Sequence, residues 1–352
     1  MRPLLPLVVG ALLNSGCGAP LIAFPTPYQK VTTISLKVVG SSANDIWWNA
    51  CQSGKRDLWH YDGTRWAQVV APGECSGTEH LFGFQSAGPG AVWLVGVTGQ
   101  GPGVSRVTTA GVIEHVGTSG QISWSSVGEH LFVVSMPDGG TNTELRQYTR
   151  TSLTKAFTPA PPGNLGSIVA TSPTDVWQDL GTTFGTPVIA NGSHFDGTTW
   201  SASMVGPTLG RLNPGFASND VWALDEDNAG GTVINAWHWD GATWTRTELP
   251  SPKRERPGGF HPGRLMKGSD GRLAVFGSWR QISGGVVGAG EQMIYRRTTT
   301  GWSEGEAVQT SRVMEGCNGS SCGVSVSGLM QDGTLVLSNA VDDSLSLIAV
   351  KP

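Results

Sequence analysis

Two short motifs alternate along the chain, and their spacing constrains the fold more than any other feature. The first motif is a turn followed by two apolar residues, of which the second is most often Trp. Its copies follow one another at intervals of 39 to 62 residues and end at Trp47, Trp93, Phe132, Trp177, Trp222, Ala274 and Val336. A supersecondary unit that recurs at this period buries its apolar surface against neighbouring copies of itself.

The second motif is an Asp-Gly pair that follows the first motif by about 15 to 25 residues. Its Asp residues and the Trp residues that follow them are Asp62 with Trp66, Asp196 with Trp200 and Asp240 with Trp244, and a worn copy ends at Trp302. Asp-Gly between two β-type runs indicates a hairpin, because the turn requires positive φ. The two motifs predict an all-β fold, a seven-bladed β-propeller of four-stranded antiparallel blades over residues 28–352.

The composition agrees with many short strands joined by tight turns. Gly accounts for 50 of the 352 residues, and charged residues account for only 14%. The repeated motif positions hold eight of the 14 Trp, and we expect these to pack between blades: Trp47, Trp93, Trp177, Trp222, Trp66, Trp200, Trp244 and Trp302. The net charge of −4 is small for this length and argues against nucleic acid as a partner.

The N-terminus has the features of an export signal. Arg2 precedes a short apolar run over residues 4–13, and small residues then lead to Cys17. Small residues directly before a Cys resemble the bacterial lipobox, although Asn14 stands where Leu is usual. We predict a signal peptide over residues 1–17, lipidation of Cys17, a short tether over residues 18–27, and a lipid-anchored protein of the bacterial cell envelope.

Four further cysteines follow in the predicted mature chain. An even number of Cys in an exported protein favours disulfides. The spacing predicts two local pairs, Cys51 with Cys75 and Cys317 with Cys322. A zinc site is disfavoured because the C-x4-C spacing has no His pair nearby, so we predict no metal there.

The loops between the second and third strands of each blade, and those between blades, are expected to carry any binding site. They are the long and irregular connections, and binding residues concentrate in such loops on a rigid scaffold. Candidate ligand-binding residues outside the repeat are Trp48, Trp124, Trp279, Arg254 and Arg256. The acidic pair Asp225 and Asp227 has oxygen ligands suited to Ca²⁺, but a solvated loop is the better interpretation, and we predict no cofactor.

Closure of the ring requires the two ends of the chain to meet. The last blade has only three candidate strands, and the segment 27–32 precedes the first blade. We therefore expect this N-terminal segment to supply the fourth strand of the last blade.

The paired motifs, D-[VI]-W followed by H-x-D-G-x-x-W, resemble the Trp-rich propeller repeats of exported bacterial lipoproteins. The second half is also similar to the Asp-box of sialidase-type propellers, which stabilises a turn. Where that box usually has Ser, two residues before the Asp, this chain has His60, His194 and His238. The resemblance covers about residues 30–350 and implies the fold, but it carries little about function.

The chain contains no H-E-x-x-H zinc motif, no P-loop and no dinucleotide-binding fingerprint, so we expect a protein that is not an enzyme. We predict a protein-binding or scaffolding propeller at the cell envelope. A carbohydrate-binding, lectin-like propeller is the alternative, and a glycan hydrolase is the second alternative. The expected partner is an envelope protein or a surface glycan, with membrane contact only through the N-terminal lipid and with a monomeric chain.

Charge is distributed unevenly along the repeats. Residues 171–250 contain nine acidic and two basic side chains, whereas residues 251–312 contain five acidic and ten basic ones. We expect the resulting dipole to orient a charged partner and to act more on the association rate than on affinity.

Overall fold

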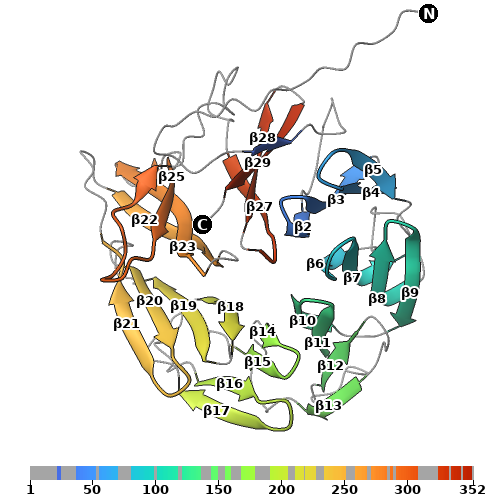
Figure 1. The fold of residues 1–352 in the computed structure, drawn as a ribbon, viewed down its shortest axis with the longest axis horizontal. Coiled ribbons are helices and arrows are strands. Elements are labelled where there is room, and N and C mark those ends of the chain that lie inside the picture. Colours follow the sequence, from blue (N-terminus) through green and yellow to red (C-terminus); the bar gives the residue numbers. More distant parts are fainter. Residues whose placement is uncertain are drawn as a thin grey trace, which may run out of the picture.

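A computed structural model places the strands in a ring of small antiparallel sheets (Figure 1). Within the described residues the strands form seven sheets, and we number them sheet one to sheet seven in chain order, starting from β2. No helix in the described part of the chain is long and apolar enough to cross a membrane. The described residues are 22–24, 37–52, 55–69, 81–98, 101–117, 121–135, 144–149, 155–159, 168–178, 191–204, 211–217, 219–226, 234–250, 258–267, 271–283, 286–287, 291–307, 324–332, 334–341 and 344–350.

In sheets one to five the first strand lies toward the centre of the ring and the fourth at its rim (Figure 1). Sheet one consists of β2 (Lys37–Ser42), β3 (Asp45–Gln52), β4 (Lys55–Tyr61) and β5 (Trp66–Val69). Sheet two consists of β6 (Leu81–Ser86), β7 (Ala91–Thr98), β8 (Gly101–Thr108) and β9 (Gly111–Gly117). Sheet three consists of β10 (Gln121–Val127), β11 (His130–Ser135), β12 (Glu144–Tyr148) and β13 (Lys155–Pro159).

The remaining sheets follow the same antiparallel order. Sheet four consists of β14 (Ile168–Ser172), β15 (Asp175–Gln178), β16 (Asn191–Phe195) and β17 (Trp200–Met204). Sheet five consists of β18 (Arg211–Ala217), β19 (Asp220–Glu226), β20 (Ile234–Trp239) and β21 (Trp244–Glu248). Sheet six consists of β22 (Gly258–Lys267), β23 (Leu273–Ser283), β25 (Glu291–Arg296) and β26 (Glu306–Ala307), with β24 (Val286–Val287) paired to β23. Sheet seven consists of β27 (Val324–Leu329), β28 (Leu335–Val341), β29 (Ser344–Val350) and β1 (Ile22–Phe24).

The Asp-Gly motifs form hairpin turns between the third and fourth strands, which confirms that part of the prediction. Gly63, Gly197 and Gly241 have φ angles of 91°, 94° and 98°, in the left-handed region that favours Gly. In each turn the Asp carboxylate accepts hydrogen bonds from the backbone N–H groups two and three residues further on. The side chain before the Gly therefore holds the turn that the Gly makes possible.

The apolar core lies between adjacent sheets. Trp47 of sheet one packs with Phe84 and Val92 of sheet two in one buried cluster. Trp177 of sheet four meets Trp244 of sheet five edge to face, with 6.1 Å between the ring centroids. Because both faces of a sheet are covered by its neighbours, the second strands are apolar on both sides, as in residues 92–95 of β7 and 131–134 of β11, whereas fourth strands such as β21 are partly exposed.

The ring is closed by a strand from the N-terminal part of the chain. β1 pairs antiparallel with β29, so that Ile22 lies opposite Ala349. An N-terminal segment thus completes the last sheet as expected, but the predicted position is wrong. The strand lies within the segment 18–27 that was expected to be a tether, and residues 27–32 lie outside the described residues. An Ile-Ala-Phe triplet has the apolar and aromatic character that suits a strand, which explains the difference.

Candidate functional site

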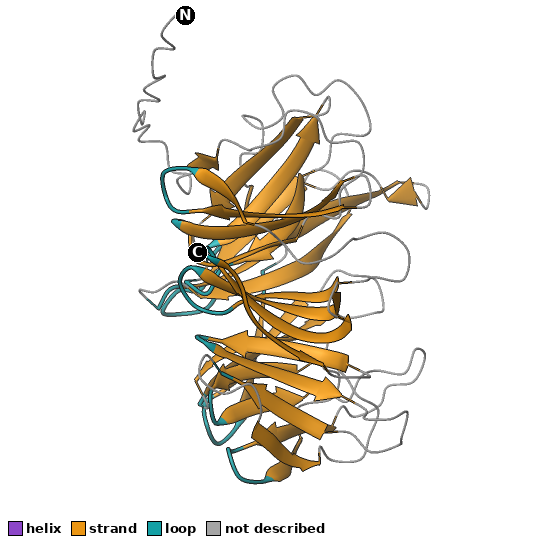
Figure 2. Ribbon diagram, turned by 90° about the vertical axis from the view of Figure 1, so that its right-hand side faces the viewer, coloured by secondary structure: helices purple, strands orange, loops and turns teal. Residues whose placement is uncertain are grey.

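The described turns gather on one side of the ring, which we call the turn face (Figure 2). They join the first strand to the second and the third strand to the fourth. In sheet one the two turns touch, since a Cβ added to Gly63 would lie 3.2 Å from the Cβ of Asn44. The recurring polar side chains of the molecule lie beside these turns.

Asp45, at the start of β3, is the centre of a buried polar cluster. Its Oδ1 lies 2.7 Å from Nε2 of His60 and accepts a 3.1 Å hydrogen bond from the backbone N–H of Gly90 in sheet two. Its Oδ2 accepts hydrogen bonds from the hydroxyl and the N–H of Ser41, at 2.5 and 3.2 Å. Burial acts to raise the pKa of Asp45, but the bonds from His60, Ser41 and Gly90 outweigh it and hold the pKa below 3.8.

Sheet four repeats this cluster at the start of β15. The carboxylate of Asp175 contacts Nε2 of His194 and the hydroxyl of Thr171. It also accepts a longer hydrogen bond, of 3.4 Å, from the indole Nε1 of Trp177. The carboxylate therefore joins three strands of the same sheet.

In sheet five the cluster reaches into the next sheet. Asp220 accepts a 2.8 Å hydrogen bond from Nε1 of Trp222, and Nε2 of His238 lies 3.0 Å from the same oxygen. Lys267 of sheet six donates to the other oxygen at 2.5 Å. Burial acts to raise the pKa of Asp220, but the bonds from Lys267, Trp222 and His238 hold it below 3.8.

Each of the three imidazole rings also contacts the Trp of its own sheet: His194 and His238 stack on it, and His60 is tilted by 40° to it. The ring centroids are 4.6 Å apart for His60 and Trp47, 4.2 Å for His194 and Trp177, and 4.3 Å for His238 and Trp222. Sequence reasoning missed this partnership of Asp, His and Trp. A signal was present, because the Asp of the first motif and the His of the second motif occur together in the same three repeats.

The strand pairings locate the positions equivalent to the Asp and the His in the other four sheets. Different residues occupy them there. In sheet three, Nδ1 of His130 lies 2.8 Å from Nε2 of Gln147, so a polar contact recurs with other chemistry. Taken in order along the chain, the equivalent pairs are Ala91 and Arg106, His130 and Gln147, Arg272 and Arg296, and Thr334 and Ala349.

The three Asp–His pairs act as clamps within and between sheets. Each pair belongs to a different sheet, and its carboxylate is occupied by hydrogen-bond donors from its surroundings. Among the described residues no three His, Cys, Asp or Glu lie close enough together to hold a metal ion. The pairs are therefore suited to fixing the geometry of the turn face rather than to converging on one ligand.

The Asp residues of the Asp-Gly turns are exposed and strongly acidic. The hydroxyl of Thr64 and the N–H groups of Arg65 and Thr64 lower the pKa of Asp62 to about 2. Equivalent backbone donors, led by Thr199, lower the pKa of Asp196. These carboxylates stabilise their own turns and remain charged at ordinary pH.

Two of the candidate ligand-binding aromatics lie in the core. Trp48 is fully buried and packs with Met330 and Val336 of sheet seven, and Trp279 is 8% exposed. Trp124 is half-buried against the apolar cluster between sheets two and three. All three rings pack in apolar clusters that include residues of the preceding sheet in the ring, so they contribute to packing and offer little surface for a sugar to stack on.

Several other predicted residues fall outside the described residues. They are Cys17, Cys75, Cys317, Cys322, Arg254, Arg256 and Asp227. Cys51 and Asp225 lie in β3 and β19, but their side chains are outside the described part of the structure.

Three solved structures resemble this arrangement of sheets. An oligogalacturonate lyase in complex with manganese has a TM-score of 0.59 and 13% identity, over 95% of this chain and 98% of that one. A prolyl endopeptidase has a TM-score of 0.61 and 12% identity, over 92% of this chain and 48% of that one. A puromycin-hydrolysing peptidase of Mycobacterium tuberculosis has a TM-score of 0.56 and 13% identity, over 93% of this chain and 54% of that one.

These likenesses show the fold alone, because the identities are low. The chain has the all-β fold of a β-propeller, and it spans about half the length of the two peptidases. No protein-family model matches the sequence, and no curated protein matches it significantly.

Proposed function

We propose that the protein is a non-catalytic propeller whose seven sheets are seven blades, and that it binds a protein partner at the bacterial cell envelope. The observation that carries this proposal is the use of the recurring polar residues. The described Asp–His pairs lie in separate sheets, and each carboxylate is taken up by donors that hold strands and sheets together. Because these recurring polar residues bond to other strands and sheets, they make the ring rigid. A rigid ring is a good scaffold for binding surfaces.

The partner can be identified with a soluble form of the predicted mature chain that begins at residue 18, just after the lipidated Cys17. We would cross-link the immobilised chain to an envelope fraction, identify the captured protein, and measure its affinity in purified form. Saturable binding with one partner per chain supports the proposal. A parallel glycan array with tryptophan fluorescence separates the alternatives, since saturable sugar binding without a protein partner would make the protein a lectin, and turnover of the glycan would make it a hydrolase.

Lipid anchoring at Cys17 is part of the same proposal. The apolar run and the small residues before Cys17 support it. Cells that express the wild-type chain should incorporate a labelled fatty acid into it, and a Cys17→Ala variant should lose both the label and its place in the membrane fraction. A wild-type chain without label would refute the anchor while leaving the partner experiment unaffected.

The proposal also includes the disulfides Cys51–Cys75 and Cys317–Cys322, as expected of an exported chain. Peptide mapping by mass spectrometry under non-reducing conditions tests them directly. Free thiols at all four positions in protein purified from the envelope would refute both bonds.

A further inference from the structure

Arg297 lies where sheet six packs against sheet five, at a position where the earlier sheets have an apolar or aromatic side chain. We call such a packing region between two adjacent sheets a seam. Its backbone N–H donates to the carbonyl of Leu273 at 2.8 Å, which continues the ladder from the pairing of Ala274 with Arg296. The equivalent residues in sheets one to five are Tyr61, Val107, Tyr148, Phe195 and Trp239. Those side chains are buried or half-buried between sheets, whereas Arg297 is exposed.

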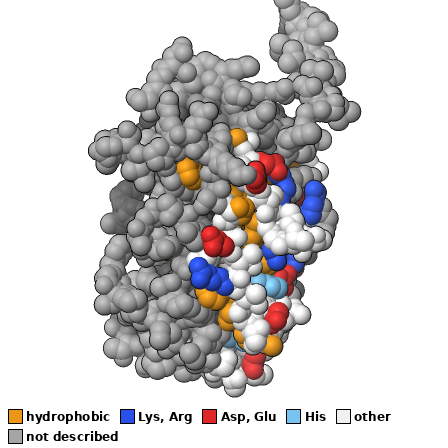
Figure 3. All heavy atoms as spheres, turned by 90° about the vertical axis from the view of Figure 1, so that its left-hand side faces the viewer, with side chains coloured by type: hydrophobic (Ala, Val, Ile, Leu, Met, Phe, Trp, Pro, Cys, Tyr) orange, Lys and Arg blue, Asp and Glu red, His pale blue; other side chains and the backbone are white. Residues whose placement is uncertain are grey.

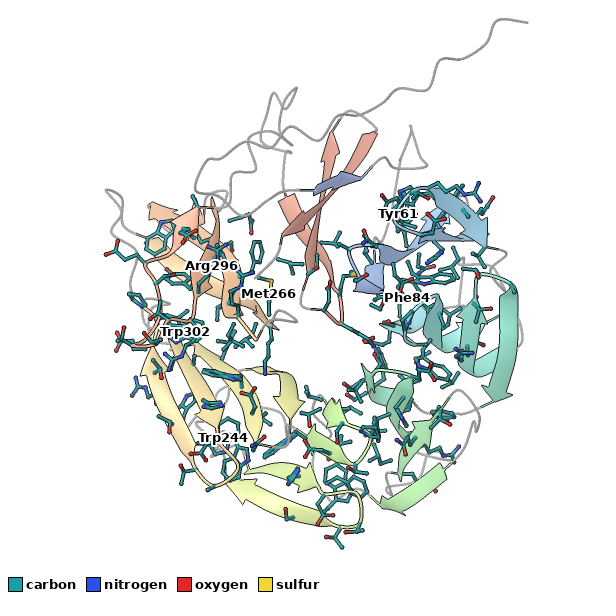
Figure 4. The ribbon with its side chains drawn as sticks, viewed as in Figure 1. Tyr61, Phe84, Trp244, Met266, Arg296 and Trp302 are labelled. Atoms are coloured by element: carbon teal, nitrogen blue, oxygen red, sulfur yellow. The ribbon has the colours of Figure 1, made fainter. Side chains whose placement is uncertain are left out.

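Aromatic rings hold the guanidinium of Arg297 in place. Its Cζ lies 5.9 Å from the ring centroid of Trp222 and 5.6 Å from that of Trp302. The two rings meet edge to face at 5.9 Å, and Figure 4 shows Trp302 where sheets five and six adjoin. Within the described part of the chain, no ion pair or side-chain hydrogen bond of the Arg297 guanidinium is found. A guanidinium positioned over rings keeps its N–H groups available for a planar acceptor.

Other cations lie at this end of sheet six. Arg272 stands where sheets one, four and five have the Asp of the Asp–His pair, and Arg296 stands where they have the His. The nearby acids Glu306 and Asp220 are each bound by a cation, Glu306 by Arg296 and Asp220 by Lys267, at 2.5 Å in both cases. Figure 3 shows this side of the molecule, where Lys and Arg side chains lie among apolar and acidic ones.

We propose that Arg297 anchors a docking site for an acidic peptide segment, rich in Asp or Glu, at the turn face between sheets five and six. The proposal rests on the protein-binding function proposed above and names the chemistry of the partner. An exposed Arg in place of an apolar seam residue gives up burial, and such a local departure is typical of a functional position. A carboxylate of the partner would accept two parallel hydrogen bonds from the guanidinium.

The rings beneath Arg297 favour a peptide over a sugar that stacks on aromatics. Trp222 and Trp302 are 5% and 8% exposed, so their faces are covered by Arg297 and by the neighbouring sheets. The group that this seam exposes to solvent is the guanidinium of Arg297, which the two rings hold in place. The basic excess of residues 251–312 would add a longer-range attraction that steers an acidic partner toward it.

The test uses a fluorescein-labelled peptide of eight Glu residues and the mature chain, with binding followed by fluorescence anisotropy and by tryptophan emission. We expect saturable binding that weakens with added salt. Arg297→Gln should weaken it by about fivefold or more, and Arg297→Lys should weaken it too, because Lys keeps the charge but loses the planar fork. The matched control is Arg65→Gln, another exposed Arg on the turn face, 3.9 Å from Asp62, which should leave the affinity unchanged.

Each of three results would overturn the proposal: no peptide binding by the wild type, equal affinity of Arg297→Gln and wild type, or an equal loss in Arg65→Gln. An uronate oligosaccharide that binds as tightly as the peptide would also overturn it, because carboxylates on any carrier would then suffice. Urea unfolding of each variant shows whether the fold is retained. If a captured envelope protein binds Arg297→Gln as tightly as wild type, the protein-binding function stands and only the acidic docking site fails.

Discussion

Nε2 of His60 lies 2.7 Å from Oδ1 of Asp45, although the two residues are 15 positions apart in the chain. Both side chains are almost fully buried, with exposed fractions of 9% and 12%. Because Gly90 of sheet two donates to the same oxygen, one carboxylate ties two strands of sheet one to the next sheet. Removal of this carboxylate leaves several donors without an acceptor.

We therefore expect Asp45→Ala to lower the free energy of unfolding by about 3 kcal/mol, as is typical when buried hydrogen-bond donors lose their acceptor. Urea denaturation followed by tryptophan fluorescence measures the change. Asp62→Ala is the control, since that carboxylate is exposed and serves only its own turn, and its effect should be clearly smaller. Equal losses in the two variants would contradict the clamp.

Acid should weaken the ring through the same carboxylates. Asp45 and Asp220 both have pKa values held below 3.8 in the folded protein. A carboxyl group with a lower pKa in the folded state contributes its full stabilisation above the unfolded pKa and loses it as pH falls through the folded value. The free energy of unfolding should therefore decrease as pH falls below about 3.8.

This pH dependence can be measured as urea midpoints between pH 6 and pH 2. Asp45→Asn, which cannot ionise at this position, should show a shallower decrease than wild type over the acidic part of the range. Parallel curves for the two proteins would mean that Asp45 contributes nothing to the acid sensitivity.

The repeated Trp residues should carry much of the stability at the seams. Trp177 is 1% exposed and meets Trp239 and Trp244 of the next sheet at centroid distances of 5.9 and 6.1 Å. Trp177→Ala should lower the free energy of unfolding by about 3–5 kcal/mol, as for other buried aromatics. Trp177→Phe retains most of the apolar contact and should lower the free energy of unfolding by less. A near-zero change in the Ala variant would show that this residue does not contribute to the core.

Closure by β1 predicts that a short N-terminal deletion destabilises the whole ring. A form of the predicted mature chain without residues 18–25 lacks β1, exposes the edge of β29, and should show a lower melting temperature and more aggregation than the chain that begins at residue 18. Deletion of residues 18–20 alone keeps β1 and serves as the control. If both truncated chains melt like the chain that begins at residue 18, the pairing of β1 with β29 adds no stability.

Local signals predicted more of this fold than of its site. The Asp-Gly turns were visible because Gly63, Gly197 and Gly241 make a turn that few other residues allow. The Asp–His pairs were not, because their members are 15 to 19 residues apart, in different motifs, and only the strand register brings them together.

The burial of Trp48 was missed for a related reason. A residue beside a repeated Trp looks free for binding in the sequence, but a sheet enclosed by two neighbours has no solvent-facing side at that depth. In sheet six the repeated motif is hard to recognise in the sequence, since Ala274 and Arg296 occupy the positions of Trp and His in sheets one, four and five. The same substitutions that obscured the repeat there produced the cationic seam around Arg297.

The pairing of Ile22 with Ala349 has a consequence for how the protein matures. Because a chain is synthesised from its N-terminus, β1 is made long before β29, and the two strands cannot pair until β29 has been made. Ile22 and Ala349 are 327 positions apart (349 − 22), and contacts so far apart in sequence form slowly. Only a complete chain therefore pairs this last sheet edge. A chain arrested during synthesis or cleaved near its C-terminus keeps an open sheet edge that proteases and chaperones can recognise.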